Sequence, residues 1–325
     1  MAGELNPVSP DPAEQSGTLG PAGSLPDVRC AGAPATGGRR SFRHLRSKLI
    51  SKLGGANHRG IDLITSADSA TQRIAGAISY TLVDKALEDE DVEVFACRAG
   101  TWSRIATART DDEGRFAFAL AGAARLPIGM RDMFVSVIGD RTGVGFLAYV
   151  APAGTQLLVS DVDGTLTSSE NAFFETILLG REPAERAGAP TAFAAALAKG
   201  YQPIYVTARG NQYTTATRDW LAHKGFPRGP MRLASSFLTL PGGDTVDFKS
   251  RTLAAFNDAG LEVAVGVGNR ASDVSAYANA GVAADRIFIE LPDYADEVVP
   301  RLEAGEAIGF TSYDALRVEQ ISQLP

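Results

Sequence analysis

The C-terminal half of the chain alternates short apolar runs with amphipathic stretches. The apolar runs have the length of strands and read QLLVSD (156–161), PIYVTAR (203–209), EVAVGVGN (262–269) and RIFIEL (286–291). Helical patterns stand between or beside them: TAFAAALAK, QYTTATRDWLAHKG, FKSRTLAAFNDAG and DVSAYANAG, three of which end at glycine. Repeated strand–helix units predict a parallel sheet with helices on both faces. We therefore expect an α/β, Rossmann-like domain over residues 153–325.

The preceding stretch, residues 61–152, has the pattern of β structure. Its β-rich runs are IAGAISYTLV, VEVFACRAG, SRIATARTDDEGRFAFAL and MFVSVIGD, separated by turn residues. Within the third run the turn cluster TDDEG precedes the alternating Phe116 and Phe118, a pattern that predicts a hairpin. We expect a β-sandwich domain here, with a role in scaffolding or surface recognition rather than catalysis.

Residues 39–60 form a basic segment with a different pattern. In RRSFRHLRSKLISKL, the apolar residues Phe42, Leu45, Leu49, Ile50 and Leu53 recur at helical spacing, and arginines and lysines fill the other positions. Two interpretations stay open: residues 39–53 lie on an anionic membrane surface, or the helix packs its apolar stripe onto the protein's own fold. Residues 1–38 are rich in Pro, Gly, Ala and Ser, and we expect them to be disordered.

Composition narrows the class of protein. The 325 residues carry a net charge of −7, which does not favour nucleic-acid binding. No run of 18 apolar residues predicts a membrane span, and the N-terminus has no secretory-signal pattern. Cys30 and Cys97 lie far apart, so neither a disulfide framework nor a zinc site is expected. The simplest expectation is a cytoplasmic protein, peripheral on a membrane if the basic segment binds lipid.

Polar residues come after several of the predicted strands. Asp161 and Asp163 come directly after the first strand, Thr207 lies at the end of the second, and Asn269 and Asp273 come after the third. Lys249 lies at the start of the helical pattern before that third strand. Because ligands bind at the carboxyl ends of parallel strands, we expect these side chains to meet in one site.

These residue types suit phosphoryl transfer. Asp161 is the candidate nucleophile and Asp163 the candidate general acid and base. Lys249 and Thr207 would hold the phosphoryl group. We expect Mg²⁺ as cofactor, with its ligands among Asp161, Asp163, Asn269 and Asp273. Taken singly, each residue has a bland explanation: a turn or Ca²⁺ loop, a surface lysine or a helix N-cap. Their combination and order favour phosphoryl transfer.

In these residues the sequence resembles the haloacid-dehalogenase-like (HAD-like) phosphatase superfamily, and within it the lipin-type (LNS2-like) phosphatidate phosphatases. The residues that carry the resemblance are DVDGT (161–165), VTAR (206–209), Lys249 and GNRASDVSAY (268–277), and the similarity extends over about residues 155–295. A β-sandwich ahead of such a domain resembles the actin-patch type of phosphatidate phosphatase, which has DIDDT where this chain has Gly164.

One departure and one caution qualify the resemblance. The fourth motif opens with Asn269 rather than an acid, so the choice between Asn269 and Asp273 as direct metal ligand stays open. Lipin-like domains of large phosphatidylinositol transfer proteins include some that have lost the nucleophile and bind phosphatidic acid without hydrolysing it. Here Asp161 and Asp163 are both present, which favours an enzyme.

The short gap between Thr165 and the next strand excludes a large cap domain, so an open site is expected. Five apolar residues in that gap could line its rim and touch acyl chains, or pack as a helix on the core: Phe173, Phe174, Ile177, Leu178 and Leu179. The sequence thus predicts Mg²⁺-dependent hydrolysis of phosphatidate, a phospholipid, to diacylglycerol and phosphate. The alternatives are a phosphatase of soluble or protein phosphomonoesters, and a non-catalytic module that binds phosphatidic acid.

Overall fold

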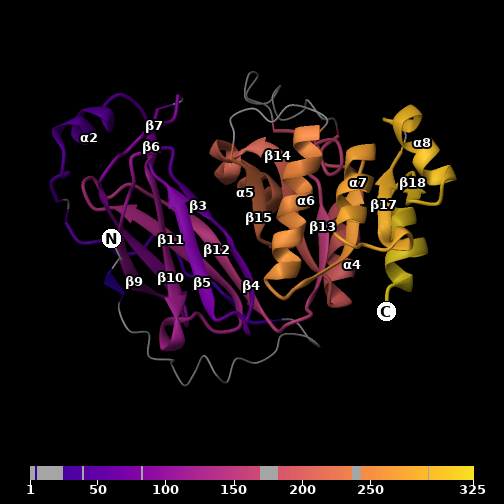
Figure 1. Cartoon of the computed structure of the whole chain (residues 1–325), viewed down its shortest axis with the longest axis horizontal. Coiled ribbons are helices and arrows are strands. Elements are labelled where there is room, and N and C mark those ends of the chain that lie inside the picture. Colours follow the sequence, from indigo (N-terminus) through magenta and orange to yellow (C-terminus); the bar gives the residue numbers. More distant parts are fainter. Residues whose placement is uncertain are drawn as a thin grey trace. The chain divides into compact units, whose positions relative to one another are not determined.

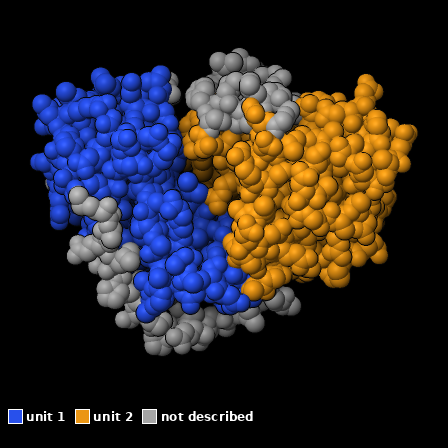
Figure 2. Space-filling view, viewed as in Figure 1, with its two compact units in different colours: residues 1–152 blue, residues 153–325 orange. Residues whose placement is uncertain are grey.

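The structure is a computed structural model that describes residues 4–5, 25–38, 40–81, 83–168, 182–235, 243–291 and 293–325. The chain divides into two compact units, Met1–Pro152 and Ala153–Pro325, coloured separately in Figure 2. The first is built of β-sheets and the second is an α/β unit with a parallel sheet (Figure 1). Both features agree with the fold class predicted from the hydrophobic pattern.

The larger sheet of the first unit has seven strands in the order β1-β9-β8-β11-β12-β4, with β2 also paired to β11. Their bounds are β1 Glu4–Leu5, β2 Asp27–Val28, β4 Leu63–Ser66, β8 Asp91–Arg98, β9 Thr101–Arg109, β11 Gly129–Val137 and β12 Gly143–Ala151. A second sheet has the order β10-β5-β3, with β3 Arg59–Ile61, β5 Thr71–Ala77 and β10 Arg115–Ala121. A two-stranded ribbon is made of β6 Ser79–Tyr80 and β7 Lys85–Ala86, and a short 3₁₀ turn spans Gly122–Ala124.

Apolar residues of the two larger sheets share one core. Ile74, Phe116 and Leu120 come from the three-stranded sheet, and Val94 and Val135 come from the seven-stranded one. In β10 the even-numbered positions are buried and the odd-numbered ones exposed, as the alternation in the sequence indicates. This packing of two sheets is the predicted sandwich.

The predicted hairpin at TDDEG is wrong. β9 pairs with β8 and β1, whereas β10 pairs with β5, so the turn at 110–114 carries the chain from one sheet to the other. Asp111 Oδ1 closes this turn by accepting hydrogen bonds from the backbone N–H groups of Glu113 (2.9 Å) and Arg115 (2.8 Å). A turn signal shows where the chain reverses but does not show which strand becomes the partner.

The basic segment forms a shorter helix than predicted. Helix α2 spans only Leu45–Ile50, and Phe42 precedes it. The helix begins where Glu90, a buried residue of the sandwich, accepts hydrogen bonds from the backbone N–H groups of Arg43 and His44, both at 3.0 Å. Because a helix start leaves backbone N–H groups without partners, this carboxylate determines where α2 begins.

Two further expectations for the N-terminal region are wrong. Residues 25–38 are ordered: Asp27 and Val28 form β2, which pairs in parallel with Met130 and Arg131 of β11. This pairing brings Cys30 next to β8, where it forms a disulfide with Cys97 (Cα–Cα 5.8 Å). Since disulfides persist mainly in oxidising compartments, the cysteines give no support to the expected reducing cytosol. Apart from Glu4–Leu5, residues 1–24 lie outside the described part of the chain.

The second unit contains a six-stranded sheet in the order β15-β14-β13-β16-β17-β18, with every neighbouring pair parallel. The strands are β13 Gln156–Ser160, β14 Gln202–Gly210, β15 Met231–Ala234, β16 Glu262–Gly268, β17 Ile287–Glu290 and β18 Ile308–Phe310. β15 and β18, the two edge strands, were not predicted from the apolar pattern. They are only four and three residues long, which weakens their signal.

Helices cover this sheet. Their bounds are α4 Ala189–Ala198, α5 Thr214–His223, α6 Gly243–Asp258, α7 Ala271–Asn279, α8 Ala295–Glu303 and α9 Tyr313–Ala315. Short 3₁₀ turns span Asn211–Tyr213, Ala284–Arg286 and Ile321–Gln323, and Leu316–Gln320 is a π-helical turn. In Figure 1, α6 and α7 lie in front of the sheet. β13 lies at the centre of the sheet between β14 and β16, so the residues after Ser160 lie at the middle of its carboxyl edge.

Among the described residues, no helix is both long enough and apolar enough to cross a membrane.

Candidate active site

The loop after β13 places Asp161 at the centre of the carboxyl edge of the sheet. The backbone N–H of Asp161 continues the sheet pairing by donating to the carbonyl oxygen of Val267 in β16 (3.1 Å). The chain then turns at Gly164, whose φ of +72° lies in the left-handed region that glycine adopts without strain. Gly164 N–H donates to Thr167 Oγ1 (2.9 Å), which closes the turn. Asp161 is therefore held in a fixed position and 5 % exposed.

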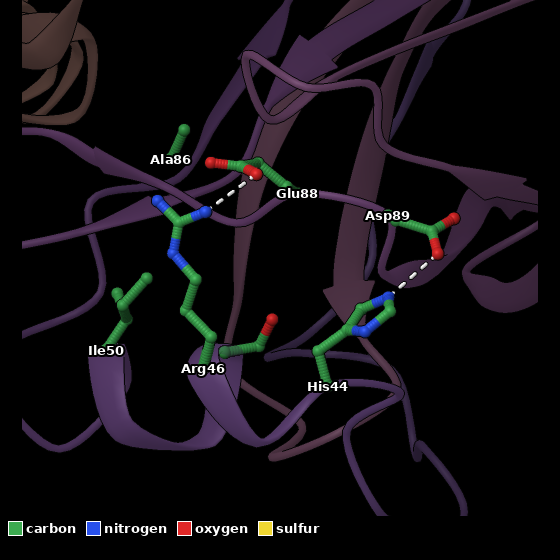
Figure 3. A pocket seen from close by; sticks show the side chains of 7 residues that line it. His44, Arg46, Ile50, Ala86, Glu88 and Asp89 are labelled. Carbon is green, nitrogen blue, oxygen red and sulfur yellow. Dashed lines mark hydrogen bonds and ion pairs between the residues drawn. The ribbon is translucent and has the colours of Figure 1, made fainter.

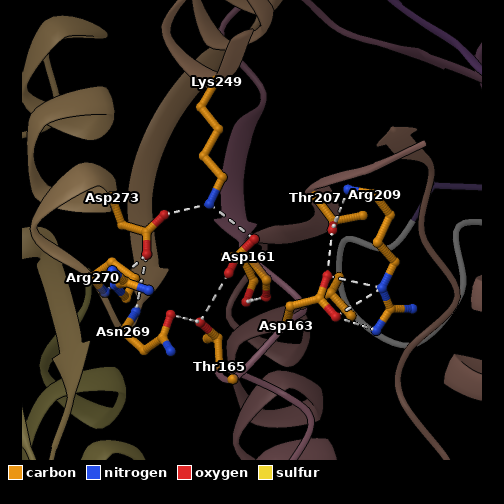
Figure 4. Close-up of polar contacts among 12 residues, drawn as sticks. Asp161, Asp163, Thr165, Thr207, Arg209, Lys249, Asn269, Arg270 and Asp273 are labelled. Atoms are coloured by element: carbon orange, nitrogen blue, oxygen red, sulfur yellow. Dashed lines mark hydrogen bonds and ion pairs between the residues drawn. The ribbon is translucent and has the colours of Figure 1, made fainter. Parts of the chain in front are cut away.

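Lys249 connects two carboxylates of this site (Figure 4). Its Nζ lies 2.9 Å from Asp161 Oδ1 and 2.6 Å from Asp273 Oδ1. The lysine is buried and lies within α6, six residues after the helix begins at Gly243, rather than at its start as the sequence suggested. Lys249 therefore makes charge-assisted contacts with two buried carboxylates. It is not the solvent-exposed lysine that the sequence left open as an alternative.

Asp273 is held by the start of α7. Its Oδ2 accepts hydrogen bonds from the backbone N–H groups of Asn269 and Arg270, both at 3.1 Å, so the residue does act as a helix cap. Its Oδ1 is left for Lys249. Gly268 is required beside it, because a Cβ there would lie 2.5 Å from Asp273 Cβ. One carboxylate thus fixes the helix start with one oxygen and contacts the site with the other.

The charges of the site depend on one another. Burial raises the pKa of Asp161 to about 7, against the attraction of Lys249, and the carboxylates of Asp273 and Asp163 raise it further. Burial opposes the charge of Lys249, but the attraction of Asp161 and Asp273 outweighs it and raises the pKa of the ammonium above its usual value. Two carboxylates beside one ammonium leave an excess of negative charge, which a cation would balance.

Asp163 points away from Asp161, toward β14. Thr207 Oγ1 donates to Asp163 Oδ2 (2.8 Å). Thr207 lies within β14 and is therefore not a helix N-cap. Arg209 donates hydrogen bonds to both oxygens of Asp163, from Nη2 to Oδ1 (2.6 Å) and from Nε to Oδ2 (2.8 Å) (Figure 4). The guanidinium is buried and also donates to Thr217 Oγ1 (3.0 Å).

Arg209 had no role in the sequence-based prediction. It lies two positions after Thr207, so on a regular strand the two side chains would share a face. That spacing was the available signal, and it points to Asp163 only once the β13–β14 pairing is known. Two further supports lie too far away in sequence to be recognised. Tyr313 Oη donates to the carbonyl oxygen of Thr165 (2.7 Å), and Arg186 Nη2 donates to that of Gly164 (3.1 Å).

Asn269 contacts the site through Thr165. Thr165 Oγ1 donates to Asn269 Oδ1 (3.0 Å) and lies 3.4 Å from Asp161 Oδ2. The Nδ2 of Asn269 is buried and has no hydrogen-bond partner among the described residues. Turning this amide by half a rotation would let Nδ2 donate to Thr165 Oγ1 and place Oδ1 where Nδ2 is now. A buried amide without a partner on one side can therefore contact a bound group. It would do so by donating from Nδ2 or, after the rotation, by offering Oδ1 as a ligand.

The donor set fits Mg²⁺ with fewer protein ligands than the sequence suggested. Within the described residues, no three His, Cys, Asp or Glu side chains converge as a metal site. Asp163 is engaged by Arg209. Asp161 and Asp273 supply two carboxylates that flank Lys249, with the Asn269 amide nearby. Mg²⁺ is commonly held by one or two carboxylates and completes its shell with water and substrate phosphate. The rim residues Phe173 to Leu179 lie outside the described residues.

The two units match two family models. Residues 158–290 match the LNS2 domain of the PITM 1-3 proteins, and residues 56–150 match the beta-sandwich domain of the same proteins. Both matches agree with the resemblance found in the motifs and with the order of the two domains.

Curated relatives cover the same region. The protein retinal degeneration B of Drosophila melanogaster is 29% identical over 255 residues, which are 77% of this chain and 19% of that protein. The membrane-associated phosphatidylinositol transfer protein 3 of Homo sapiens is 26% identical over 255 residues, 77% of this chain and 25% of the relative. The chain thus spans about a fifth to a quarter of the length of these relatives.

Solved structures similar to the chain include two phosphatases. A magnesium and phosphate complex of the D,D-heptose 1.7-bisphosphate phosphatase of B. bronchiseptica covers 52% of this chain and is itself covered to 99%, with 14% identity and a TM-score of 0.40. A cobalt-bound deoxy-D-mannose-octulosonate 8-phosphate phosphatase of Haemophilus influenzae covers 52% of this chain and is covered to 88%, with 13% identity and a TM-score of 0.34.

Proposed function

We propose that this chain, in which an LNS2-type domain of HAD-like fold comes after a β-sandwich domain, is a Mg²⁺-dependent phosphatase that hydrolyses phosphatidate to diacylglycerol and phosphate. The observation that carries the proposal is the buried contact of Lys249 with both Asp161 and Asp273 at the carboxyl edge of the sheet. A lysine and two carboxylates at the end of the central strand form a constellation suited to phosphoryl transfer.

The reaction would run in two steps. A carboxylate oxygen of Asp161 attacks phosphorus, the bond from phosphorus to the glycerol oxygen breaks, and Asp163 gives a proton to that leaving oxygen. Water then attacks the aspartyl-phosphate and Asp163 takes its proton, so that phosphate leaves and both carboxylates return to their first state. Lys249 holds Asp161 in line, and Thr207 and Arg209 hold Asp163. Bound Mg²⁺, held by Asp161 and Asp273 with Asn269 beside them, would supply positive charge to the phosphoryl oxygens.

A lipid is the favoured substrate because the site has little room for a cap. The chain between Ser160 and Gln202 includes α4, which packs on the core, so this connection is too short for a separate cap domain. An open site suits a phosphate head group at a membrane. The names of the relatives link their whole chains to phosphatidylinositol transfer and to membranes. The same proposal makes an anionic membrane the partner of residues 39–53.

The test is release of phosphate from phosphatidate dispersed in detergent micelles, with and without Mg²⁺. We expect Mg²⁺-dependent release by the wild type and at least a thousandfold loss in Asp161→Asn, which keeps the shape of the side chain but removes the nucleophile. Val318→Ser, a change at an exposed position away from the site, is the matched control.

One observation favours a second candidate, a module that binds phosphatidic acid without hydrolysing it. Both oxygens of Asp163 accept hydrogen bonds from the Arg209 guanidinium, so in this arrangement both are already engaged. To act as an acid, Asp163 must leave Arg209 or share it with the incoming phosphate. Vesicle binding without any phosphate release would establish this candidate. Release from small phosphomonoesters but not from phosphatidate would instead indicate a phosphatase of soluble substrates.

A further inference from the structure

Exposed apolar side chains gather at one corner of the first unit. Of the eight large apolar side chains that are exposed in the described residues, four belong to this corner: Leu45 (73 % exposed), Leu49 (56 %), Leu53 (74 %) and Val83 (74 %). The first two lie on α2, and Leu53 lies three residues after its end. Leaving such tips in water is unfavourable, so their concentration points to a partner.

The turn that carries Val83 lies beside the end of the basic segment. Thr81 N–H donates to the carbonyl oxygen of Gly55 (2.9 Å), and a Cβ on Gly54 would lie 3.1 Å from Thr81 Cα. The two segments are therefore side by side, although about thirty residues separate them in sequence. We call Leu45, Leu49, Leu53 and Val83 the apolar corner.

The rest of the basic segment packs inward. Ile50 and Ser47 are buried, and Phe42 packs against the sandwich core. Figure 3 shows Arg46 directed to Glu88 and His44 directed to Asp89. These four residues line a pocket of about 270 Å³, together with Ser47 and Ile50 of α2. The predicted apolar stripe is therefore divided, because Phe42 and Ile50 hold the segment on the fold while the three leucines face outward.

The charges of the segment are divided in the same way. Arg43, His44 and Arg46 are paired with acidic side chains of the sandwich. Lys48, Lys52 and Lys85, the last on β7, are exposed and make no ion pair with any described residue. The acid of the neighbouring turn, Asp84, is engaged by Arg59 (2.6 Å) and so does not neutralise them. Three uncompensated lysines therefore accompany the apolar corner.

We propose that the apolar corner with Lys48, Lys52 and Lys85 is a docking face for an anionic lipid bilayer. Lysine is depleted at protein–protein interfaces, whereas lysines beside protruding leucines are what an anionic bilayer surface attracts. The four apolar tips would enter the acyl boundary while the lysines contact the lipid phosphates. This face rests on the proposed membrane role of residues 39–53 and is independent of phosphate release. Compared with the membrane contact expected for residues 39–53, this docking face includes Val83 and Lys85 and leaves out Phe42 and Ile50.

The first test is sedimentation of the full chain with vesicles of phosphatidylcholine, with or without phosphatidylglycerol, and containing no phosphatidate. We expect wild-type binding only when phosphatidylglycerol is present, and a drop in the partition coefficient of about fivefold for each of Lys48→Gln and Lys52→Gln. Arg73→Gln, an exposed change on β5 of the same unit, is the control and should bind as the wild type does. Leu49→Ser with Leu53→Ser should lower binding by at least tenfold, while Val318→Ser, equally exposed at 56 %, should not.

A second measurement reports insertion directly. Leu49→Trp should shift its fluorescence to the blue on anionic vesicles and be quenched by brominated lipid, whereas Val318→Trp should show neither effect. Thermal unfolding of each variant in buffer establishes that it is folded.

Three results would overturn the docking face: no binding of the wild type to anionic vesicles, unchanged binding of the Leu49→Ser, Leu53→Ser variant, or self-association of the wild type that this variant abolishes. The last would identify a second copy of the chain as the occupant. A failure of the phosphatase proposal looks different, because Asp161→Asn should bind vesicles normally and the apolar-corner variant should still release phosphate from detergent micelles.

Discussion

At the scale of single residues, Arg209 and Asp163 decide how the site can work. Arg209 holds both oxygens of Asp163 and is itself fixed by Thr217. If Asp163 passes protons, Arg209 positions it. We predict that Arg209→Gln lowers kcat for phosphatidate by about ten- to a hundredfold with a much smaller change in KM, because general acid–base catalysis contributes on that scale or more. Arg209→Lys should recover part of the loss. Equal effects on KM and kcat, or none on either, would show that Arg209 does not position the acid.

The proposed Mg²⁺ site gives a prediction that can be tested without measuring catalysis. Mg²⁺ at ten times its dissociation constant should stabilise the second unit by about 1.4 kcal/mol, because it binds the folded state. Asp273→Asn removes one of the two carboxylates beside Lys249, while asparagine can still cap α7. Thermal unfolding with and without Mg²⁺ should therefore show a shift in wild type that is absent in this variant. A shift of the same size in both would exclude Asp273 as a ligand.

Glu290, a buried carboxyl group of β17, gives a pH prediction. Burial raises its pKa to about 7, against the attraction of Arg186 and with the charge of Asp293 adding to the rise. In the unfolded chain the value is about 4.3, so between roughly pH 4 and 7 the folded state holds more protons and stability falls as pH rises. Glu290→Gln should remove this fall in the free energy of unfolding, which is about 3–4 kcal/mol in size. Urea unfolding of the wild type and the variant near pH 4 and near pH 7 measures this change in the free energy of unfolding. An equal dependence on pH in the two proteins would contradict the prediction.

At the scale of elements, the Cys30–Cys97 disulfide ties the segment around β2 to β8. Its two cysteines are 67 residues apart. Cross-linking such a loop restricts the unfolded chain, and we predict that Cys30→Ser destabilises the first unit by about 2–4 kcal/mol. Denaturant unfolding should show this loss for the first unit alone, and reduction of the wild type should reproduce it. An unchanged midpoint would show that the pairing of β2 with β11 suffices.

In the second unit, strands β13, β14, β16 and β17 and helices α4 to α7 could be predicted because their apolar patterns are local signals. The carboxyl-edge rule then brought Asp161, Lys249 and Asp273 to one place, and the structure has them in contact. The features that the sequence could not show depend on distant partners. Glu90 sets the start of α2, and β11 brings Cys30 to Cys97. The change of sheet between β9 and β10 is of the same kind, since a turn does not specify its pairing.

At the scale of the whole molecule, the candidate active site lies in one unit and the proposed docking face lies on the other. The first depends on Asp161, Lys249 and Asp273, and the second on the outward leucines and exposed lysines around α2. Each can be tested without the other. The proposed docking face lies in the β-sandwich unit, and the candidate site residues lie in the other unit.

The most direct test of the central claim is phosphate release from phosphatidate in the presence of Mg²⁺, with wild type and Asp161→Asn compared in the same micelles. We predict Mg²⁺-dependent release by the wild type and at least a thousandfold less by the variant. No release by a folded wild-type protein, or equal release by the two, would contradict the claim.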